Sequence, residues 1–110
     1  GTFYEIDKDG NKSTRVVGDN YEVVAGSSYV NIKGTANLTI DSNCNTYIKG
    51  NWNIQVDGTK TEVVTGAVSE TYKSSKTENV TGAVSETYSS TQTTAVSSNV
   101  TITGSKIDLN

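Results

Sequence analysis

The sequence contains no histidine, proline or methionine, and it has only one cysteine, one tryptophan and one phenylalanine. Without histidine, the chain lacks a common catalytic base and a common zinc ligand. The lone Cys44 has no second thiol with which to form an intrachain disulfide or a metal cluster. We therefore expect no metal and no cofactor, and we interpret Cys44 as a small apolar side chain of the interior.

Long apolar runs and excess positive charge are also missing. Only 33% of the 110 residues are hydrophobic, the formal net charge is −3, and the 9 basic residues are scattered. These features predict neither a membrane-spanning helix nor a nucleic-acid-binding surface, and they leave little for a conventional globular core. The absence of proline and the regular spacing of valine and isoleucine favour an ordered chain over a disordered one.

The nine-residue string VTGAVSETY occurs twice, and the second copy begins sixteen residues after the first. Glycine divides this interval in two, because small residues recur every eight positions along the chain. Such a position predicts a repeated corner, where a bulky side chain is excluded. The corner series comprises Gly10, Gly18, Gly26, Gly34, Gly50, Gly58, Gly66 and Gly82, with serine at Ser42, Ser74, Ser90 and Ser98.

An apolar column precedes the glycine series by two residues and has the same period. Its members are Val16, Val24, Ile32, Ile40, Ile48, Val56, Val64, Val80 and Val96, with tyrosine at Tyr72 and Tyr88. The repeat is thus V-x-G-x-x-x-x-x, which is too short for a helical hairpin and is typical of one strand and one corner. A unit of this size buries its apolar side only by stacking on its neighbours.

Alternate residues of a strand share a face, so the residues two and four places before each column member should lie on the same face as the column. We call this face the column face. It is apolar from about Val30 to Val56 and mixed beyond, where it carries Glu62, Glu70, Glu78 and Glu86 with Lys60 and Lys76. If these carboxylates lie inside an assembly, they must meet lysine, water or an ion, or become protonated.

Two closed all-β arrangements bury this column. One chain could wind through three faces per coil, or three chains could wind together, each contributing one face at a time. The three-chain arrangement would surround one axis with valine and isoleucine from three copies, which would stabilise so hydrophilic a chain. The period alone is compatible with both arrangements.

The segments VVGDNYEVV, IKGTANLTI, IKGNWNIQVDG and ITGSKIDLN resemble the C-terminal needle of the central spike of T-even-type contractile-tail phages. The resemblance extends from Thr2 to Asn110 and implies an intertwined, homotrimeric triple-stranded β-helix shaped as a triangular prism. It also implies three parts: an N-terminal junction segment at 1–13, the octad-repeat β-helix at 14–98 and a C-terminal tip at 99–110. The iron site of some such tips contains histidine, which this chain lacks.

The function implied by this resemblance is mechanical. The needle belongs to the virion, at the tail baseplate, and sheath contraction pushes it through the host outer membrane into the periplasm. We expect no catalytic residues here, because the carboxylates follow the repeat instead of converging; a lysozyme activity would lie in an upstream domain. Two alternatives remain open: the spike of a type VI secretion apparatus of the valine-glycine-repeat family, and a trimeric fibrous adhesin.

The end of the chain departs from the column, because Gly104 stands where an apolar residue is expected. The last residues may be interpreted in two ways. They either cap the open end themselves, or form a platform for a small cone-shaped tip protein of the proline-alanine-alanine-arginine repeat type, as the resemblance implies. The residues concerned are Ser105, Lys106, Ile107, Asp108, Leu109 and Asn110. The other partners implied are two further copies of the chain, upstream spike and tail-hub domains and, transiently, the host outer membrane.

Overall fold

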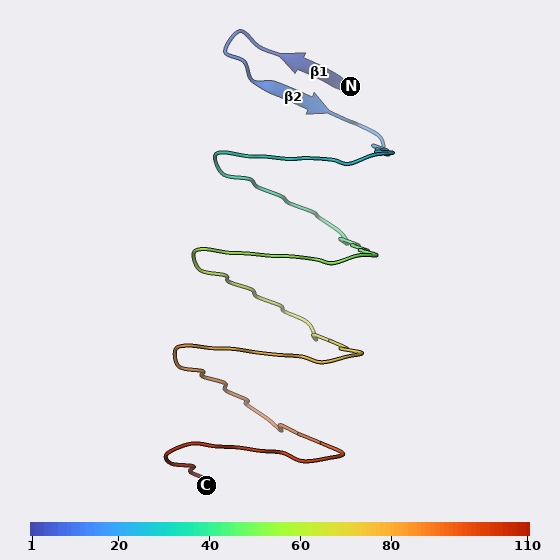
Figure 1. Ribbon diagram of the computed structural model, residues 1–110. Helices are drawn as coiled ribbons and strands as arrows, with labels where there is room; N and C mark the ends of the chain where they lie inside the picture. Colours follow the sequence, from blue (N-terminus) through green and yellow to red (C-terminus); the bar gives the residue numbers. More distant parts are fainter. The chain divides into compact units, whose positions relative to one another are not determined.

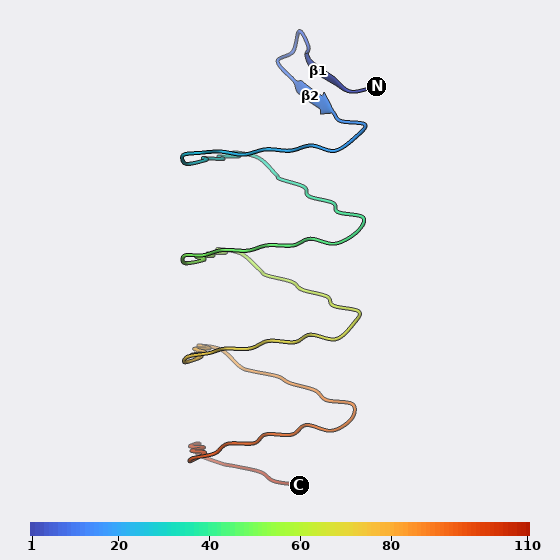
Figure 2. The same ribbon diagram turned by 90° about the vertical axis from the view of Figure 1, so that its right-hand side faces the viewer.

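The computed structural model describes residues 1–110 as two units, unit 1 (Gly1–Gln55) and unit 2 (Val56–Asn110). Regular secondary structure is confined to a two-stranded antiparallel hairpin in unit 1, formed by β1 (Phe3–Ile6) and β2 (Lys12–Arg15). Elsewhere, the chain of each unit runs in nearly straight segments between bends (Figures 1 and 2). No segment forms a helix of the length and hydropathy needed to cross a bilayer.

The hairpin pairs Phe3 with Arg15 at its open end and closes through a turn that begins at Asp7. The Asp7 carbonyl accepts a hydrogen bond from the Gly10 N–H at 3.1 Å, and the Asp7 N–H donates to the Asn11 carbonyl at 3.0 Å. Gly10 has a φ of 83°, a left-handed conformation that glycine adopts without steric cost. A turn followed by a left-handed glycine is a common three-residue hairpin connection.

The carboxylate of Asp7 holds this turn together. Its Oδ1 accepts hydrogen bonds from the backbone N–H groups of Asp9 and Asn11, each at 2.9 Å, and its Oδ2 accepts one from the Asn11 side chain at 3.1 Å. These bonds favour the ionised carboxylate, and the Asn11 N–H contributes most to lowering the pKa of Asp7. The hairpin lies across the predicted boundary at residue 13, since β2 ends at Arg15.

Beyond the hairpin, unit 1 bends at a fixed interval of eight residues. Each bend consists of a residue of the glycine series and the residue before it. The bends lie at 17–18, 25–26, 33–34, 41–42 and 49–50. The first of them is tied to the start of the hairpin, because the Val17 N–H donates to the Thr2 hydroxyl at 3.1 Å.

Unit 2 follows the same interval from its first residues. Its bends lie at 57–58, 65–66, 73–74, 81–82, 89–90 and 97–98, and a last one is centred on Ser105. Glycine and serine alternate irregularly in these bends, so serine is an adequate substitute for glycine at this position of the repeat.

The backbone between the bends has no partner in its own chain. In segments 18–54 and 58–110, no backbone group forms a hydrogen bond with another backbone group. The chain also contains no buried side chain, either apolar or polar. Folded proteins pair nearly all their backbone N–H and C=O groups and bury an apolar core. These segments therefore expose both unpaired backbone groups and apolar side chains.

Candidate functional site

The column face is the candidate site, because side chains two residues apart meet on it within single straight segments. Members of the apolar column are about half covered, with exposed fractions from 39% at Val16 to 58% at Val64. Apolar side chains elsewhere in the repeat are much more exposed, such as Tyr29 at 91% and Val63 at 88%. In each unit, the apolar column is thus partly covered by other residues of the chain.

Side chains two residues apart meet on this face, as the alternation of a straight segment requires. In unit 1, the Cys44 sulfur lies 3.9 Å from the Thr46 hydroxyl. The Cys44 thiol, predicted to be an interior side chain, is exposed in the single chain. No group of three or more potential metal ligands comes together anywhere in the chain.

In unit 2, two of the four column-face glutamates form ion pairs with lysine. Lys60 Nζ lies 3.1 Å from Glu62 Oε1, and Lys76 Nζ lies 2.7 Å from Glu78 Oε1. The hydrogen bond with Lys76 is the main cause that lowers the pKa of Glu78, and the same bond raises the pKa of Lys76. In each pair, the lysine precedes the glutamate by two residues.

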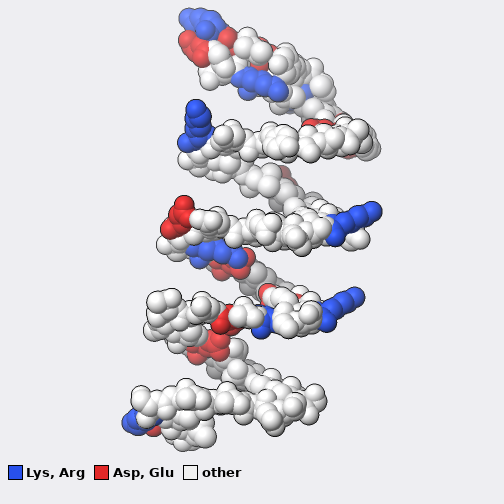
Figure 3. All heavy atoms as spheres, in the orientation of Figure 1, with Lys and Arg blue, Asp and Glu red and all other residues white.

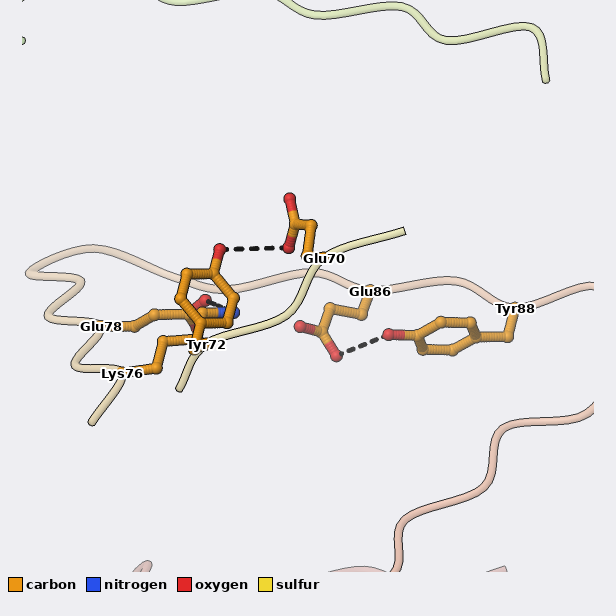
Figure 4. Close-up of polar contacts among 6 residues, drawn as sticks. All are labelled: Glu70, Tyr72, Lys76, Glu78, Glu86 and Tyr88. Atoms are coloured by element: carbon orange, nitrogen blue, oxygen red, sulfur yellow. Dashed lines mark hydrogen bonds and ion pairs between the residues drawn. The ribbon is translucent and has the colours of Figure 1, made fainter. Parts of the chain in front are cut away.

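The other two glutamates accept hydrogen bonds from tyrosine. The Tyr72 hydroxyl donates to Glu70 Oε2 at 3.2 Å, and the Tyr88 hydroxyl donates to Glu86 Oε2 at 3.3 Å (Figure 4). The negative charge of Glu86 is the main cause that raises the pKa of Tyr88, followed by the hydrogen bond itself. Here the donor follows the glutamate by two residues.

These four pairs form a polar ladder, which we define as Lys60–Glu62, Glu70–Tyr72, Lys76–Glu78 and Glu86–Tyr88. Its members alternate between a lysine donor and a tyrosine donor in successive octads. Lys76 Nζ also lies 5.2 Å from the centre of the Tyr72 ring, within cation–π distance. Every glutamate of the four therefore has its own donor within the same chain.

Lysine is one of the several partners that the sequence analysis allows for these glutamates, whereas tyrosine is not among them. Tyr72 and Tyr88 had been considered only as members of the apolar column. Their spacing would have indicated the second role, because each stands two residues after a glutamate and shares its face. All side chains of the ladder are exposed in the single chain, and isolated exposed pairs of this kind contribute little to stability.

The predicted corner glycines adopt two different conformations. Gly10 lies in the hairpin turn with its left-handed φ, whereas Gly18, Gly26, Gly34, Gly50, Gly58, Gly66 and Gly82 lie in the octad bends without a positive φ. At none of the seven bend glycines would an added Cβ meet another atom of the chain within 4 Å. Contacts within one chain therefore do not explain why these positions carry glycine.

The predicted tip residues lie at the end of unit 2. Lys106 Nζ and Asp108 Oδ2 form an exposed ion pair at 3.5 Å. Ile107 is about half covered, whereas Leu109 is almost fully exposed. Figure 3 shows the charged side chains as separate groups along the molecule, with uncharged surface between them.

Comparison with known proteins gives one partial match. Over 47 residues, the chain is 40% identical to Protein Gp5 of Vibrio phage KVP40. The matched stretch is 43% of this chain, and it spans 11% of the length of the phage protein. No family model and no solved structure matches the chain. The chain is thus similar, over somewhat less than half its length, to a protein of a phage.

Proposed function

We propose that three copies of this chain wind around one another as an intertwined, parallel triple-stranded β-helix. The observation that carries this proposal is the unpartnered backbone of segments 18–54 and 58–110, which keeps an eight-residue bend through both units. Leaving so many N–H and C=O groups unpaired beside apolar side chains would be unfavourable for a chain on its own. Neighbouring copies supply both the hydrogen-bond partners and the missing cover for the column.

A close neighbour also accounts for the bend glycines. An added Cβ would meet nothing in the same chain, so the restriction to glycine or serine points to a contact from outside it. In the trimer, the corners of neighbouring copies stack along each edge of the prism at about 4.8 Å, where small residues allow close approach.

We further propose that this trimer is the membrane-piercing needle of a contractile phage tail. The similarity to a phage protein supports a virion component, located at the tail baseplate spike, over the spike of a secretion apparatus. Eleven octads at about 4.8 Å each give a needle on the order of 50 Å, comparable with a bilayer and its headgroups at about 40–45 Å. The role is structural, without catalysis or a bound cofactor.

The force for piercing comes from outside the needle. Its outward positions are rich in threonine, serine and asparagine, and such polar groups do not enter hydrocarbon spontaneously. Contraction of a tail sheath, transmitted through upstream spike and hub domains, supplies the work and carries the needle across the host outer membrane.

The end of the needle is proposed to hold a tip protein. Residues Ser105 to Asn110 of three copies would form a blunt platform for a small cone-shaped protein of the proline-alanine-alanine-arginine repeat type. Deleting these six residues should leave the trimer intact and abolish pull-down of such a protein. Unchanged pull-down would place the platform elsewhere.

Immunogold electron microscopy tests the proposed function in the virion. An antibody raised against the purified chain should label the distal end of the tail, more strongly in contracted particles than in extended ones. Labelling of the tail fibres, or of no particle, would contradict the proposal. A glycan array provides a second test, since binding of the chain to a surface sugar would indicate an adhesin instead.

A further inference from the structure

The outward side of the repeat carries a charge series that the proposed function does not explain. Between Glu22 and Lys60, the chain contains only four charged residues. They are spaced by eight residues, and their signs alternate strictly: Lys33, Asp41, Lys49 and Asp57. Each is the first residue of a bend. All the charge of this long segment is therefore concentrated at one position of the repeat.

These charges are not paired with one another in the single chain. Lys33, Asp41 and Lys49 form no ion pair, whereas three lysines of unit 2 each lie within 4 Å of a carboxylate. A strand rises about 3.3 Å per residue, so residues eight apart on successive straight segments lie too far from each other to pair. Neighbouring members of the series can therefore meet one another only if they belong to different chains.

We propose that this charge series sets the register between copies, by placing each octad of one copy beside the next octad of a neighbouring copy. Lys33 of one copy then lies beside Asp41 of a second, and Asp41 of the first lies between Lys33 of the third and Lys49 of the second. This inference rests on the proposed trimer and specifies which residues of the copies meet. The partner is a second copy of this chain, offset by eight residues.

The offset follows from threefold symmetry. In the proposed prism, each octad moves the chain to the next face and down the axis by one strand spacing. The strand directly above it on that face belongs to another copy. That strand is the preceding octad of the repeat. Adjacent strands then come from different copies and differ by one octad. The bend positions of successive octads stack along each edge, about 4.8 Å apart. Opposite charges at this spacing attract, and like charges would repel.

A single chain winding on itself would place different residues together. Its adjacent strands would be three octads apart, so Lys33 would lie beside Asp57, Asp41 beside Thr65 and Lys49 beside Lys73. This arrangement gives one opposite pair, one uncharged pairing and one repulsive pair. The eight-residue offset gives three opposite pairs from the same four residues. Charge complementarity thus favours separate copies.

The sixteen-residue repeat agrees with the same offset. On one edge of the column face, Lys60 and Lys76 alternate with Val68 and Val84 in successive octads. An eight-residue offset therefore separates each lysine from the next by a valine of another copy. In the column itself, the bulky Tyr72 likewise lies between Val64 and Val80. The doubled unit keeps lysines and large rings out of adjacent strands, whereas the glutamates of the column face occur in every octad from Glu62 to Glu86.

Disulfide trapping tests the register in the full chain. In a Cys44→Ala background, Lys33→Cys with Asp41→Cys removes one charge of each sign and should join three copies covalently, because adjacent strands lie within the Cα separation of a disulfide. Denaturing electrophoresis without reductant should give a band near three times 11.7 kDa, about 35 kDa. As a control, Lys33→Cys with Lys49→Cys separates the thiols by two strand spacings, about 10 Å, and should not crosslink.

The outcomes separate the register from the trimer. A trimer in solution that crosslinks through residues 33 and 49, or through neither pair, would overturn the register and leave the trimer standing. A monomer in which Lys33→Cys and Asp57→Cys form an internal disulfide would overturn both proposals.

Charge inversion tests the role of the charges themselves. A chain carrying Lys33→Asp, Asp41→Lys, Lys49→Asp and Asp57→Lys keeps the alternation and should form trimers with itself. When it is co-expressed with the natural chain and only one of them bears an affinity tag, mixed trimers place like charges side by side. If the two chains mixed at random, the untagged chain would be recovered with the tagged one in the amount given by a binomial distribution. We expect several-fold less of the untagged chain than this amount. Recovery at the binomial expectation would show that the charges do not select the register.

Discussion

Unit 1 and unit 2 bend at the same interval but differ in the column face, which carries charged side chains mainly in unit 2. From Val23 to Gln55, the charged residues of unit 1 lie at the bends and the column face is apolar. In unit 2, the column face carries glutamate, lysine and tyrosine, joined in the polar ladder. The same repeat therefore accepts two kinds of lining, provided that each charged side chain has a donor or acceptor within reach.

The difference has a consequence for stability. An apolar lining requires only shape and area, whereas a polar lining depends on each hydrogen bond being formed. In the proposed trimer, unit 1 would therefore supply most of the free energy of association. Unit 2 would be more specific in its pairing and more sensitive to substitution and to pH.

Placing a charge in the apolar lining should have the largest effect. Ile40→Asp would bring three unpaired carboxylates to one axis of the trimer, at about 3–5 kcal/mol for each buried and uncompensated charge. We expect no trimer by light scattering. Thr39→Asp, one residue away on the opposite side of the segment, should leave the trimer intact. A stable Ile40→Asp trimer would contradict the assignment of the column face.

Breaking a lysine pair of the ladder should cost less. Lys76→Gln leaves Glu78 without its cation and should lower the free energy of unfolding of the trimer, by less than Ile40→Asp does. The chain provides its own control, because the equivalent positions sixteen residues later are Gln92 and Thr94. The double variant Lys76→Gln with Glu78→Thr should recover most of the loss in denaturant unfolding. Equal stability of the single and double variants would contradict this role of the pair.

Removing a tyrosine hydroxyl should have a smaller effect. Tyr72→Phe keeps the ring in the column but leaves Glu70 without its donor, at about 1–3 kcal/mol per chain if the pair is enclosed. The matched change Tyr21→Phe removes a hydroxyl that donates to Asp19 at 3.4 Å on the outward side. It should change stability by less than about 0.5 kcal/mol. Equal effects in thermal unfolding would mean that both tyrosines remain in solvent.

The effect of pH should be the most modest and, outside the hairpin turn that Asp7 holds, should be confined to unit 2. The pKa of Glu78 is lowered by Lys76, so its contribution is present above the ordinary glutamate value of 4.5 and is lost as the pH falls through the lowered one. The pKa of Tyr88 is raised, so its contribution is present below 10.0 and is lost as the pH rises through the raised value. Hydrogen-exchange protection factors, corrected for intrinsic rates, should decrease at both extremes in unit 2 and change little in segment 24–54.

The periodic features could be predicted from the sequence because they are local and repeated many times. The bends occur at the glycine and serine series, and residues two apart meet on one face, as alternation requires. The hairpin was missed, although Asp7 followed three residues later by Gly10 is a turn signal. It lies where the repeat is irregular, so periodicity gave no information there.

The tyrosine donors could not be predicted from the column alone. Each aromatic ring satisfies the apolar pattern, and the second role becomes evident only when the spacing of two residues from Glu70 to Tyr72 and from Glu86 to Tyr88 is considered as well. The arrangement of copies was likewise left open by the period, since one chain and three chains share it. The alternation of charge from Lys33 to Asp57 favours the three-chain proposal, because charge complementarity depends on which octads become neighbours.

Mass in solution tests the central claim most directly. Sedimentation equilibrium of the full chain at neutral pH should give a single species of three times 11.7 kDa, about 35 kDa, with β-sheet circular dichroism. A folded species of 11.7 kDa would contradict the account, because one chain would then pair its own backbone and cover its own column.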